Sequence, residues 1–459
     1  MLRKHQVVLG VFMAVLMTSG CASLPTPPRR HFILIDKEGY PVSETKGERI
    51  QLKEFERDYV GPILQGIDEY VKKELAEGRT PRLLVFVHGG LNQYSDGLGR
   101  VERLLAAQKL KAEYPALSSH YLVFLNWDGS LWSSVADDLV FVRGGKRREW
   151  WKGVWVAPFM FAARLAEAVL SAPETWWFQL DSVGDSLRRS EEGDDSCDPR
   201  RAPVIEAKLK DVDLRKTASY VPLFPLRLAV PIAIQGFGRP AWDMLQRRAD
   251  SVFSMERTEG REDPKAGVIF MERLKERIPE KGRWSIEGEG KSGELQITLV
   301  GHSMGTLVLN RLLARFHELY FDRIVYLAAA ASIREVETVG MGYLRTHRDA
   351  KLWSFSLSQT DEASEQNPGA LGERGTLLLW IDNLFGRVTS PSRKTFGRYE
   401  NLQEYVNFSP ESFTERRVTL VKFNGRDDYG RDPREHGDFN KPEVLERILE
   451  AVETGQCPP

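Results

Sequence analysis

The chain has 459 residues, of which 42% are hydrophobic and 28% are charged, and its formal net charge is -1. A charge this close to neutral excludes the electrostatic surface that nucleic acid or an anionic membrane would need. Three cysteines are too few for a disulfide scaffold, so a hydrophobic core must hold the fold, and a single bridge between Cys197 and Cys457 stays open.

Residues 1–20 have the layout of a secretory signal peptide: a basic start, the apolar run "QVVLGVFMAVLM" and small residues before a cysteine. The apolar run is too short to span a bilayer. Its end resembles a bacterial lipoprotein lipobox, with Thr18 where such boxes usually carry Leu, and the resemblance implies that Cys21 is lipidated. Residues 21–30 then form a Pro-rich tether. Plain secretion, with Cys21 an ordinary residue, is the alternative.

From His31 onward, short strands and helices are predicted to alternate. "HFILID" and "ERIQL" are predicted strands, and helical spacing over 58–78 predicts a helix that ends in Gly. "RLLVFVHGG" and "HYLVFLNWDG" are typical of buried parallel strands. Such alternation predicts an α/β fold with right-handed crossovers. Four more strands are predicted in 294–303, 322–332, 350–361 and 416–428, with helices in 266–280 and 305–319.

One interval is too long for a simple crossover, because about 165 residues separate the strand near Trp127 from the strand near Leu295. We therefore expect a large helical insert over 129–264, within an α/β domain formed by 31–128 and 265–459. Five of the eleven tryptophans lie in residues 150–177. The insert is either a region packing its own small core against the sheet, or a cap or lid with an apolar face toward an acyl substrate or the membrane interface.

Residues 301–305 read "GHSMG"; they follow the apolar run "LQITLV" and precede a helix of apolar periodicity. A strand, then GxSxG, then a helix is the pattern of a nucleophile elbow, a turn so tight that its flanking positions must lack bulky side chains. Gly301 and Gly305 are then steric requirements for presenting the serine. Ser303 is the predicted nucleophile.

A serine hydroxyl needs a base, and three histidines follow Ser303. His317 is excluded, because fourteen residues of helix place it about 20 Å away. His347 is excluded because it lies before a predicted strand, and not after the end of one. His436 follows the last predicted strand in a Gly- and Asp-rich loop, where the catalytic groups of such sheets gather. His436 is therefore the predicted base, and a surface loop histidine is the alternative.

The base needs a carboxylate that holds its tautomer and stabilises the imidazolium. Asp361 ends the predicted strand 350–361 and comes between the serine and the histidine in the chain, so it is the predicted partner. Its neighbour Glu362 is expected to point elsewhere. Asp427 and Asp428, at the end of the following strand, are competing candidates.

Two loops are predicted to donate hydrogen bonds to an oxyanion. The first donor is the backbone N–H of Met304, directly after the nucleophile. The second is the N–H of Gly90 or Leu91 in "FVHGGLN", where Gly89 and Gly90 allow the backbone to approach closely. His88 is predicted to shape this loop through hydrogen bonds rather than to act as a base.

"HGG" after a strand, "GHSMG", Asp361 and His436, in this order, resemble the α/β-hydrolase superfamily, in particular its lipase- and esterase-like members. The resemblance covers roughly residues 80–128 and 265–440. It implies a mainly parallel central sheet flanked by helices, and hydrolysis of carboxylic esters through an acyl-serine and a Ser-His-Asp triad. Thioesterase, amidase or phospholipase activity with the same triad, and a non-catalytic binding lipoprotein, are the alternatives.

No metal or organic cofactor is expected, since neither HExxH nor a clustered Cys/His set is present. The expected partners are a small-molecule or lipid ester and a membrane bound through the N-terminal lipid, and nucleic acid is not expected. Ala22 after the cysteine resembles the sorting pattern for the periplasmic side of a bacterial outer membrane. The oligomeric state and the acyl chain length stay open.

Overall fold

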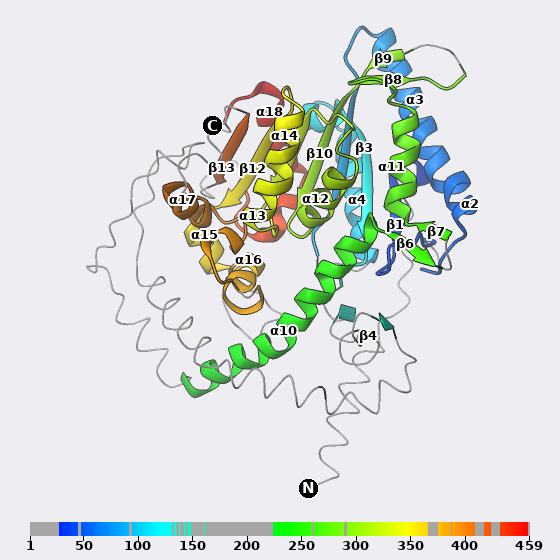
Figure 1. Cartoon of the computed structure of the whole chain (residues 1–459). Helices are drawn as coiled ribbons and strands as arrows, with labels where there is room; N and C mark the ends of the chain where they lie inside the picture. Colours follow the sequence, from blue (N-terminus) through cyan, green and yellow to red (C-terminus); the bar gives the residue numbers. More distant parts are fainter. Residues whose placement is uncertain are drawn as a thin grey trace.

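The computed structural model (Figure 1) describes the following residues: 27–44, 47–90, 94–130, 133–134, 137, 142–143, 146–147, 160, 224–258, 261–288, 292–365, 375–386, 388–408, 417–423 and 432–457. The predicted signal peptide, the predicted lipidation site at Cys21 and most of the tryptophan-rich segment 150–177 lie outside these residues. The same holds for Leu91, Asp427 and Asp428.

A seven-stranded sheet forms the centre of the fold, and each neighbouring pair of its strands is parallel. The strands are apolar runs that are mostly buried, as expected where helices cover both faces of a parallel sheet. The predicted α/β class is confirmed. In spatial order the strands are β1 (Phe32–Ile35), β3 (Tyr121–Trp127), β2 (Arg82–Val87), β10 (Gln296–His302), β11 (Arg323–Leu327), β12 (Lys351–Leu357) and β13 (Val418–Phe423).

Helices flank this sheet (Figure 1). α4 (Tyr94–Gln108) follows β2 and packs on β3, α12 (Gly305–Arg315) follows β10, and α18 (Pro442–Thr454) comes last. α18 begins with Pro and ends at Gly455 in a left-handed conformation, the usual asymmetry of helix ends. The other helices are α2 (Leu52–Phe55), α3 (Gly61–Ala76), α5 (Pro115–Ser118), α10 (Phe224–Val252), α11 (Ala266–Glu276), α13 (Ile333–Glu335), α14 (Met341–Thr346), α15 (Gln359–Ser364), α16 (Leu377–Trp380) and α17 (Tyr399–Phe408).

Shorter elements complete the description. The 3₁₀ turns are η1 (Arg29–His31), η9 (Pro391–Arg393) and η10 (His436–Asn440), and the π-helical turns are η2 (Glu56–Val60), η6 (Val336–Gly340) and η8 (Ile381–Phe385). Three antiparallel pairs lie outside the main sheet: β4 (Val142–Arg143) with β5 (Lys146–Arg147), β6 (Met255–Thr258) with β7 (Arg261–Pro264), and β8 (Arg283–Ser285) with β9 (Ser292–Glu294).

Three strand predictions are wrong in detail. The strand predicted over 322–332 ends at Leu327. The segment "ERIQL" contributes an isolated bridge between Val42 and Arg49 and then enters α2, instead of forming a strand. The strand predicted over 350–361 ends at Leu357, because Ser358 caps α15: its side chain accepts a hydrogen bond from the N–H of Asp361. Asp361 therefore lies in the first turn of a helix and not at a strand end.

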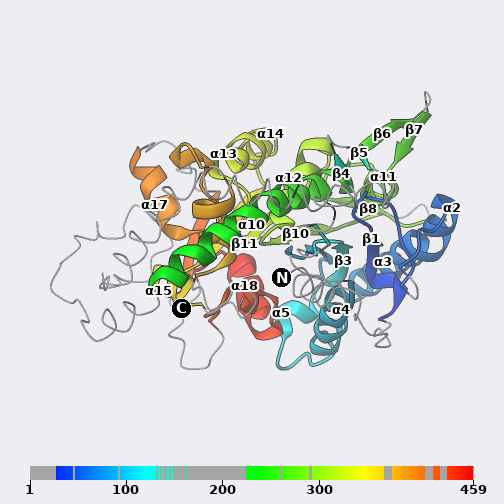
Figure 2. The same cartoon turned by 90° about the horizontal axis from the view of Figure 1, so that it is seen from below.

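The described part of the insert is mainly α10, a long helix that runs diagonally across the molecule (Figure 1 and Figure 2). It packs against α12 and η8, and Arg239 donates a hydrogen bond of 2.9 Å to the carbonyl of Leu384. The side chain of Arg311 on α12 also pairs with Asp250 of α10 at 2.5 Å. The C-terminal half of α10 is therefore fixed to the sheet domain. Among the described helices, none is long and apolar enough to cross a membrane.

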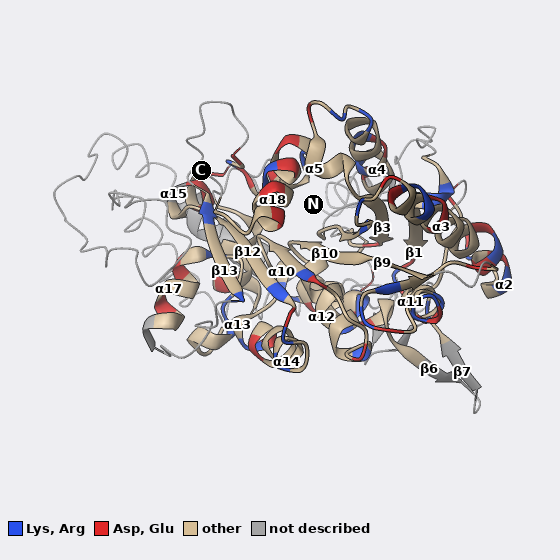
Figure 3. Ribbon diagram, turned by 90° about the horizontal axis from the view of Figure 1, so that it is seen from above, with Lys and Arg blue, Asp and Glu red and all other residues tan. Residues whose placement is uncertain are grey.

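Charged residues of both signs are interspersed on the outer helices α2, α3 and α11, whereas the strands carry few of them (Figure 3). This distribution agrees with the near-zero net charge of the chain. Near the C-terminus, Cys457 is disulfide-bonded. Cys21 and Cys197, the only other cysteines of the sequence, both lie outside the described residues.

Candidate functional site

The loops after β2 and β10 meet where the strand order reverses. From β2 the chain crosses through α4 to β3 on one side, and from β10 it crosses through α12 to β11 on the other side. β2 and β10 are themselves paired neighbours. Open α/β sheets bind their ligands at the carboxyl edge of such a reversal point. The "HGG" and "GHSMG" segments lie at this edge.

Ser303 has a left-handed backbone conformation, with φ of 51°, which is uncommon for a residue other than Gly. Its neighbours hold this conformation. The Ser303 N–H donates to the carbonyl of Leu327 at 2.8 Å, and the Ser303 carbonyl accepts from the Ala330 N–H at 3.1 Å and from the Thr306 hydroxyl at 2.6 Å. A strained residue of this kind persists only where its surroundings over-determine it, and such residues cluster at functional sites.

The two loops approach each other too closely for side chains. A Cβ on Gly305 would lie 2.2 Å from the carbonyl oxygen of Val87, and a Cβ on Gly89 would lie 2.9 Å from the Cβ of Ser303. Both distances are shorter than real Cβ contacts, so glycine is required at both positions. The steric reason that the sequence suggested for these glycines therefore applies.

The two predicted oxyanion donors belong to residues that lie against each other. A Cβ on Gly90 would be 2.3 Å from the Sδ of Met304. Leu91, the other candidate in this loop, lies outside the described residues. His88 accepts the Trp127 N–H through Nε2 at 3.2 Å, so its Nδ1 carries the proton and donates to the Gly89 carbonyl at 2.6 Å. The carbonyl of His88 accepts the Trp127 indole N–H at 3.0 Å, so this histidine does shape its loop.

His436 begins η10, after the last strand, and is buried next to the elbow. Its ring lies 5.0 Å, centroid to centroid, from the ring of His302, the residue before Ser303. The Nε2 of His302 lies 3.0 Å from the carbonyl of His436 and donates to it. Burial lowers the pKa of His436 to about 4. At neutral pH the imidazole is therefore uncharged, which is the form that a general base requires.

Several polar atoms at this edge are buried and unpaired. The Oγ of Ser303, both ring nitrogens of His436 and the Nδ1 of His302 have no hydrogen-bond partner within the part of the chain that the structure describes. Ser303 is only 2% exposed. Ser303 and His436 are thus both buried and are not hydrogen-bonded to each other, and catalytic hydrogen bonds are often unformed in the absence of substrate. Buried polar groups without a partner are rare in folded proteins, so this edge is a candidate ligand site.

Asp361 is not hydrogen-bonded to the His436 ring. Its Oδ2 accepts the hydroxyl of Ser358 at 2.7 Å, within the cap of α15. A different carboxylate contacts the histidine: the Oε2 of Glu365 accepts the backbone N–H of His436 at 2.7 Å. Two further candidates for the acid lie outside the described residues: Asp427 and Asp428.

Glu362, one residue beyond Asp361, is almost fully buried. Its Oε2 accepts the hydroxyl of Thr376, and its Oε1 has no partner among the described residues. Burial raises the pKa of Glu362 to about 8, although the charge of Arg398 acts against this shift. The carboxyl group is therefore protonated at neutral pH, and it is a poor partner for an imidazolium.

Sequence reasoning did not single out three residues at this edge, of which His302 and Arg100 are buried and Glu365 is partly buried. His302 lies inside the elbow motif, but its contact joins it to a residue 134 positions away. Glu365 reaches across 71 positions to His436. Arg100 lies on α4, two turns after the "HGG" loop, and its charge lowers the pKa of both His88 and His302 beyond the effect of burial. Such long-range contacts leave no pattern in the local sequence.

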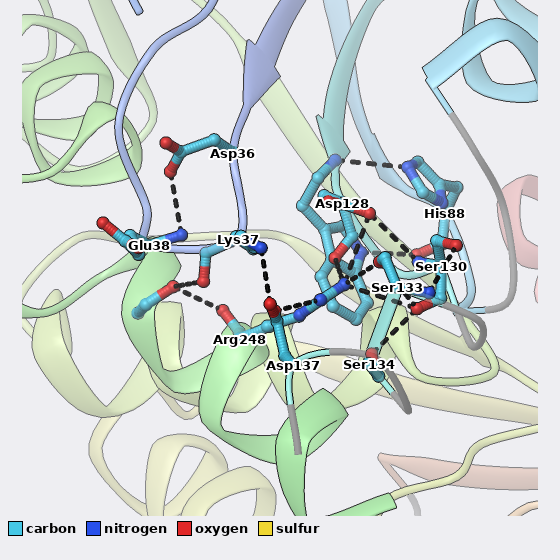
Figure 4. Close-up of polar contacts among 12 residues, drawn as sticks. Asp36, Lys37, Glu38, His88, Asp128, Ser130, Ser133, Ser134, Asp137 and Arg248 are labelled. Carbon is cyan, nitrogen blue, oxygen red and sulfur yellow. Dashed lines mark hydrogen bonds and ion pairs between the residues drawn. The ribbon is translucent and has the colours of Figure 1, made fainter. Parts of the chain in front are cut away.

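A second buried polar cluster lies where the chain enters and leaves the insert (Figure 4). Arg248 of α10 donates to Asp137 at 2.6 Å and to the hydroxyl of Ser133 at 2.8 Å, and it pairs with Asp128 at 3.4 Å. Asp137 also accepts the ammonium of Lys37 at 2.6 Å. Two cations therefore face two carboxylates, and the cluster ties the loop after β1 and the segment after β3 to α10.

Among the described residues, no group of three or more His, Cys, Asp or Glu side chains is arranged to hold a metal ion. Comparisons of the chain with protein-family models, with curated proteins and with solved structures give no match. The functional interpretation therefore depends on the residues and their geometry.

Proposed function

We propose that this protein is a serine hydrolase of α/β-hydrolase fold that cleaves carboxylic esters through an acyl-serine. One observation carries the proposal: Ser303 occupies a left-handed turn between β10 and α12, at the reversal point of the sheet, and the neutral, buried imidazole of His436 lies against the ring of His302, the residue before the serine. A serine needed only for structure gains nothing from backbone strain of this kind.

In the proposed reaction, the Ser303 oxygen attacks the ester carbonyl while the His436 imidazole takes the hydroxyl proton. The oxyanion of the tetrahedral intermediate accepts the N–H of Met304 and that of Gly90 or Leu91, next to the positive end of α12. As the C–O bond breaks, the alcohol leaves with the proton from the imidazolium. Water then repeats these steps on the acyl-serine and releases the acid.

The carboxylate partner proposed for His436 is Asp361, from its order in the chain and its place after β12. Its hydrogen bond to Ser358 would have to give way to one with the imidazole. An Asp-to-Asn change in a working triad costs about 10⁴-fold in rate. We expect that loss for Asp361→Asn. A much smaller loss in Asp361→Asn, beside a full loss in Ser303→Ala, would assign the acid to Asp427, Asp428 or Glu365.

A second candidate function is ligand binding without catalysis. The observation in its favour is that Ser303 and His436 are not hydrogen-bonded to each other and that the serine is closed off from solvent. Thioesterase, amidase and phospholipase activity would use the same residues as an esterase, so only substrate comparison separates them.

Membrane attachment through a lipid on Cys21, on the periplasmic side of a bacterial outer membrane, belongs to the same proposal. The signal-like N-terminus and its Pro-rich tether support it. The disulfide at Cys457 is compatible with it, because disulfides persist outside the reducing cytosol. Mass spectrometry of the mature N-terminus tests it, since a lipidated Cys21 and an unmodified Cys21 differ in mass by the acyl chains.

The proposal is tested by fluorophosphonate labelling of the full chain in detergent. We expect the wild type to be labelled at Ser303, and Ser303→Ala and His436→Ala to lose the label. His317→Ala is the matched control, because the side chain of His317 is 72% exposed and should not matter. 4-Nitrophenyl esters of increasing chain length then size the acyl pocket. A folded wild type that takes no label would favour the binding function instead.

A further inference from the structure

Arg100 is a buried cation with unsatisfied donors beside the candidate site. It is 4% exposed, and its Nε and NH1 have no hydrogen-bond partner among the described residues. Burial, together with the charge of Arg103, lowers the pKa of Arg100 to about 10, against the opposing effect of Asp96. The guanidinium nevertheless stays charged at neutral pH. A buried charge of this kind is costly unless an anion faces it.

The surroundings of Arg100 carry further donors, and the charge of Asp96, one turn earlier on α4, does not offset the effect of burial on the pKa of Arg100. The electrostatic effect of Arg100 reaches His88 and His302, the histidines of the two loops that meet at Ser303. Gly97, one turn earlier on α4, would place a Cβ 3.1 Å from the Oδ1 of Asn126, whose buried Nδ2 also has no partner within the described chain.

These groups share one property, which is that they can stabilise an anion. His302, directly before the serine, is a neutral histidine that lies against the neutral His436 of η10, and α12 directs its positive end toward the same edge. A guanidinium with free N–H groups suits a carboxylate or phosphate oxygen better than any neutral ligand.

We propose that Arg100 binds an anionic oxygen group of the substrate, so that the enzyme selects esters carrying a carboxylate or a phosphate near the scissile bond. This inference rests on the proposed hydrolase function, because it takes the bound anion to be part of an ester substrate. The anion site itself is a property of Arg100 and can be measured without catalysis. Arg100 acts here as a specificity-determining residue and takes no part in the covalent steps.

The catalytic arm compares two pairs of esters on the full chain. 4-Nitrophenyl hexanoate and the mono-4-nitrophenyl ester of hexanedioic acid differ by a carboxylate on the acyl side, and phenyl butyrate and 4-carboxyphenyl butyrate differ on the leaving side. We expect the wild type to prefer the anionic member of at least one pair. Arg100→Met should reduce that ratio of kcat/KM by about 10-fold or more, as for a lost charge-assisted hydrogen bond. Arg100→Lys should retain part of it.

The binding arm needs no activity. Inorganic phosphate should raise the Tm of the wild type more than that of Arg100→Met, with Arg103→Met as the matched control, because Arg103 is an exposed arginine on the same helix. If the wild type took no label at Ser303 but phosphate still raised its Tm through Arg100, the hydrolase function would be refuted and the anion site would be retained.

Three outcomes would overturn the inference. Labelling could persist while both ester ratios and the phosphate shift stay the same in Arg100→Met. Arg100→Met could fail to fold while Arg103→Met folds, which would make Arg100 a structural residue. Arg100 could also hold only a buried water next to His302, in which case phosphate would shift the Tm of the wild type and of Arg100→Met equally.

Discussion

Arg248 and Arg100 are both buried arginines, with 2% and 4% of their surface exposed, yet the fold surrounds them in opposite ways. Arg248 faces Asp137 and Asp128 and donates to Ser133, so that only its Nε lacks a partner within the described chain. Arg100 has two donor atoms without a partner among the described residues, and its pKa is lowered.

This difference separates buried polar groups that stabilise the fold from buried polar groups that could bind a ligand. A buried ion pair with its hydrogen bonds made fixes one arrangement of the chain, and removing one partner is strongly destabilising. Unmatched polar groups lower the stability of the folded chain until a ligand or water meets them. The Arg248 cluster therefore joins the insert to the sheet, and the edge around Ser303 is the place where we propose that a ligand binds.

The largest effect is expected at Ser303. Ser303→Ala should lower kcat/KM for 4-nitrophenyl butyrate by about 10⁴-fold or more. It should leave the free energy of unfolding unchanged or raise it, because the hydroxyl that is removed is buried and has no partner in the described part of the chain. Ester hydrolysis and urea unfolding of the same preparation measure both quantities.

Ser133→Ala is the control for that experiment, since it also removes a serine hydroxyl, but from the Arg248 cluster. There the hydroxyl accepts from Arg248, so we expect a loss of about 1.5–3 kcal/mol in stability and little change in rate. Equal stability losses in the two variants would remove the distinction between the two regions.

The next largest effect concerns the insert. Arg248→Met leaves Asp137 buried with Lys37 as its remaining cation, and it should cost about 3–5 kcal/mol in the free energy of unfolding. Urea unfolding measures it, with Arg247→Met as the control because Arg247 is exposed on the same helix. Arg100→Met should lose less than Arg248→Met, and a larger loss at Arg100 would reverse the comparison.

A smaller effect follows from the buried histidines. The pKa of His436 is about 4 in the folded chain because of burial, against 6.5 ordinarily. Between these values the unfolded chain binds a proton that the folded chain does not, so stability is present above pH 6.5 and is lost as the pH falls. From pH 7 to pH 5 this histidine should account for about 2 kcal/mol.

His436→Gln should remove that part of the pH dependence in urea unfolding at pH 7, 6 and 5. His120 is buried far from the elbow, and burial lowers its pKa to about 4 as well, so His120→Gln should change the slope by a similar amount. If His436→Gln left the slope as it was, the imidazole would already be charged in the folded chain.

The sequence predicted the sheet and the elbow because both depend on local physics. Apolar runs bounded by glycines become buried parallel strands. The glycines of "GHSMG" are needed because a Cβ at these positions would clash with neighbouring atoms. Asp361 was misplaced although the spacing from Ser358 is that of a helix cap, since an apolar run before it suggested a longer strand. His302, Glu365 and Arg100 depend on contacts between distant segments, for which periodicity gives no signal.

The smallest effect on ester hydrolysis is expected at Glu362, a buried carboxyl with one oxygen that has no partner among the described residues. Its pKa of about 8 in the folded chain exceeds the ordinary value of 4.5, so the folded chain binds a proton that the unfolded chain lacks. Stability is then full below pH 4.5 and falls as the pH rises to 8. Glu362→Gln keeps the shape and the bond to Thr376 without that loss, so relative to the wild type it should gain about 4 kcal/mol in the free energy of unfolding between pH 4.5 and pH 8. Ester hydrolysis should stay within a few-fold of wild type, because a protonated carboxyl does not stabilise an imidazolium; a loss near 10⁴-fold would instead make Glu362 the triad acid and join it to the functional edge.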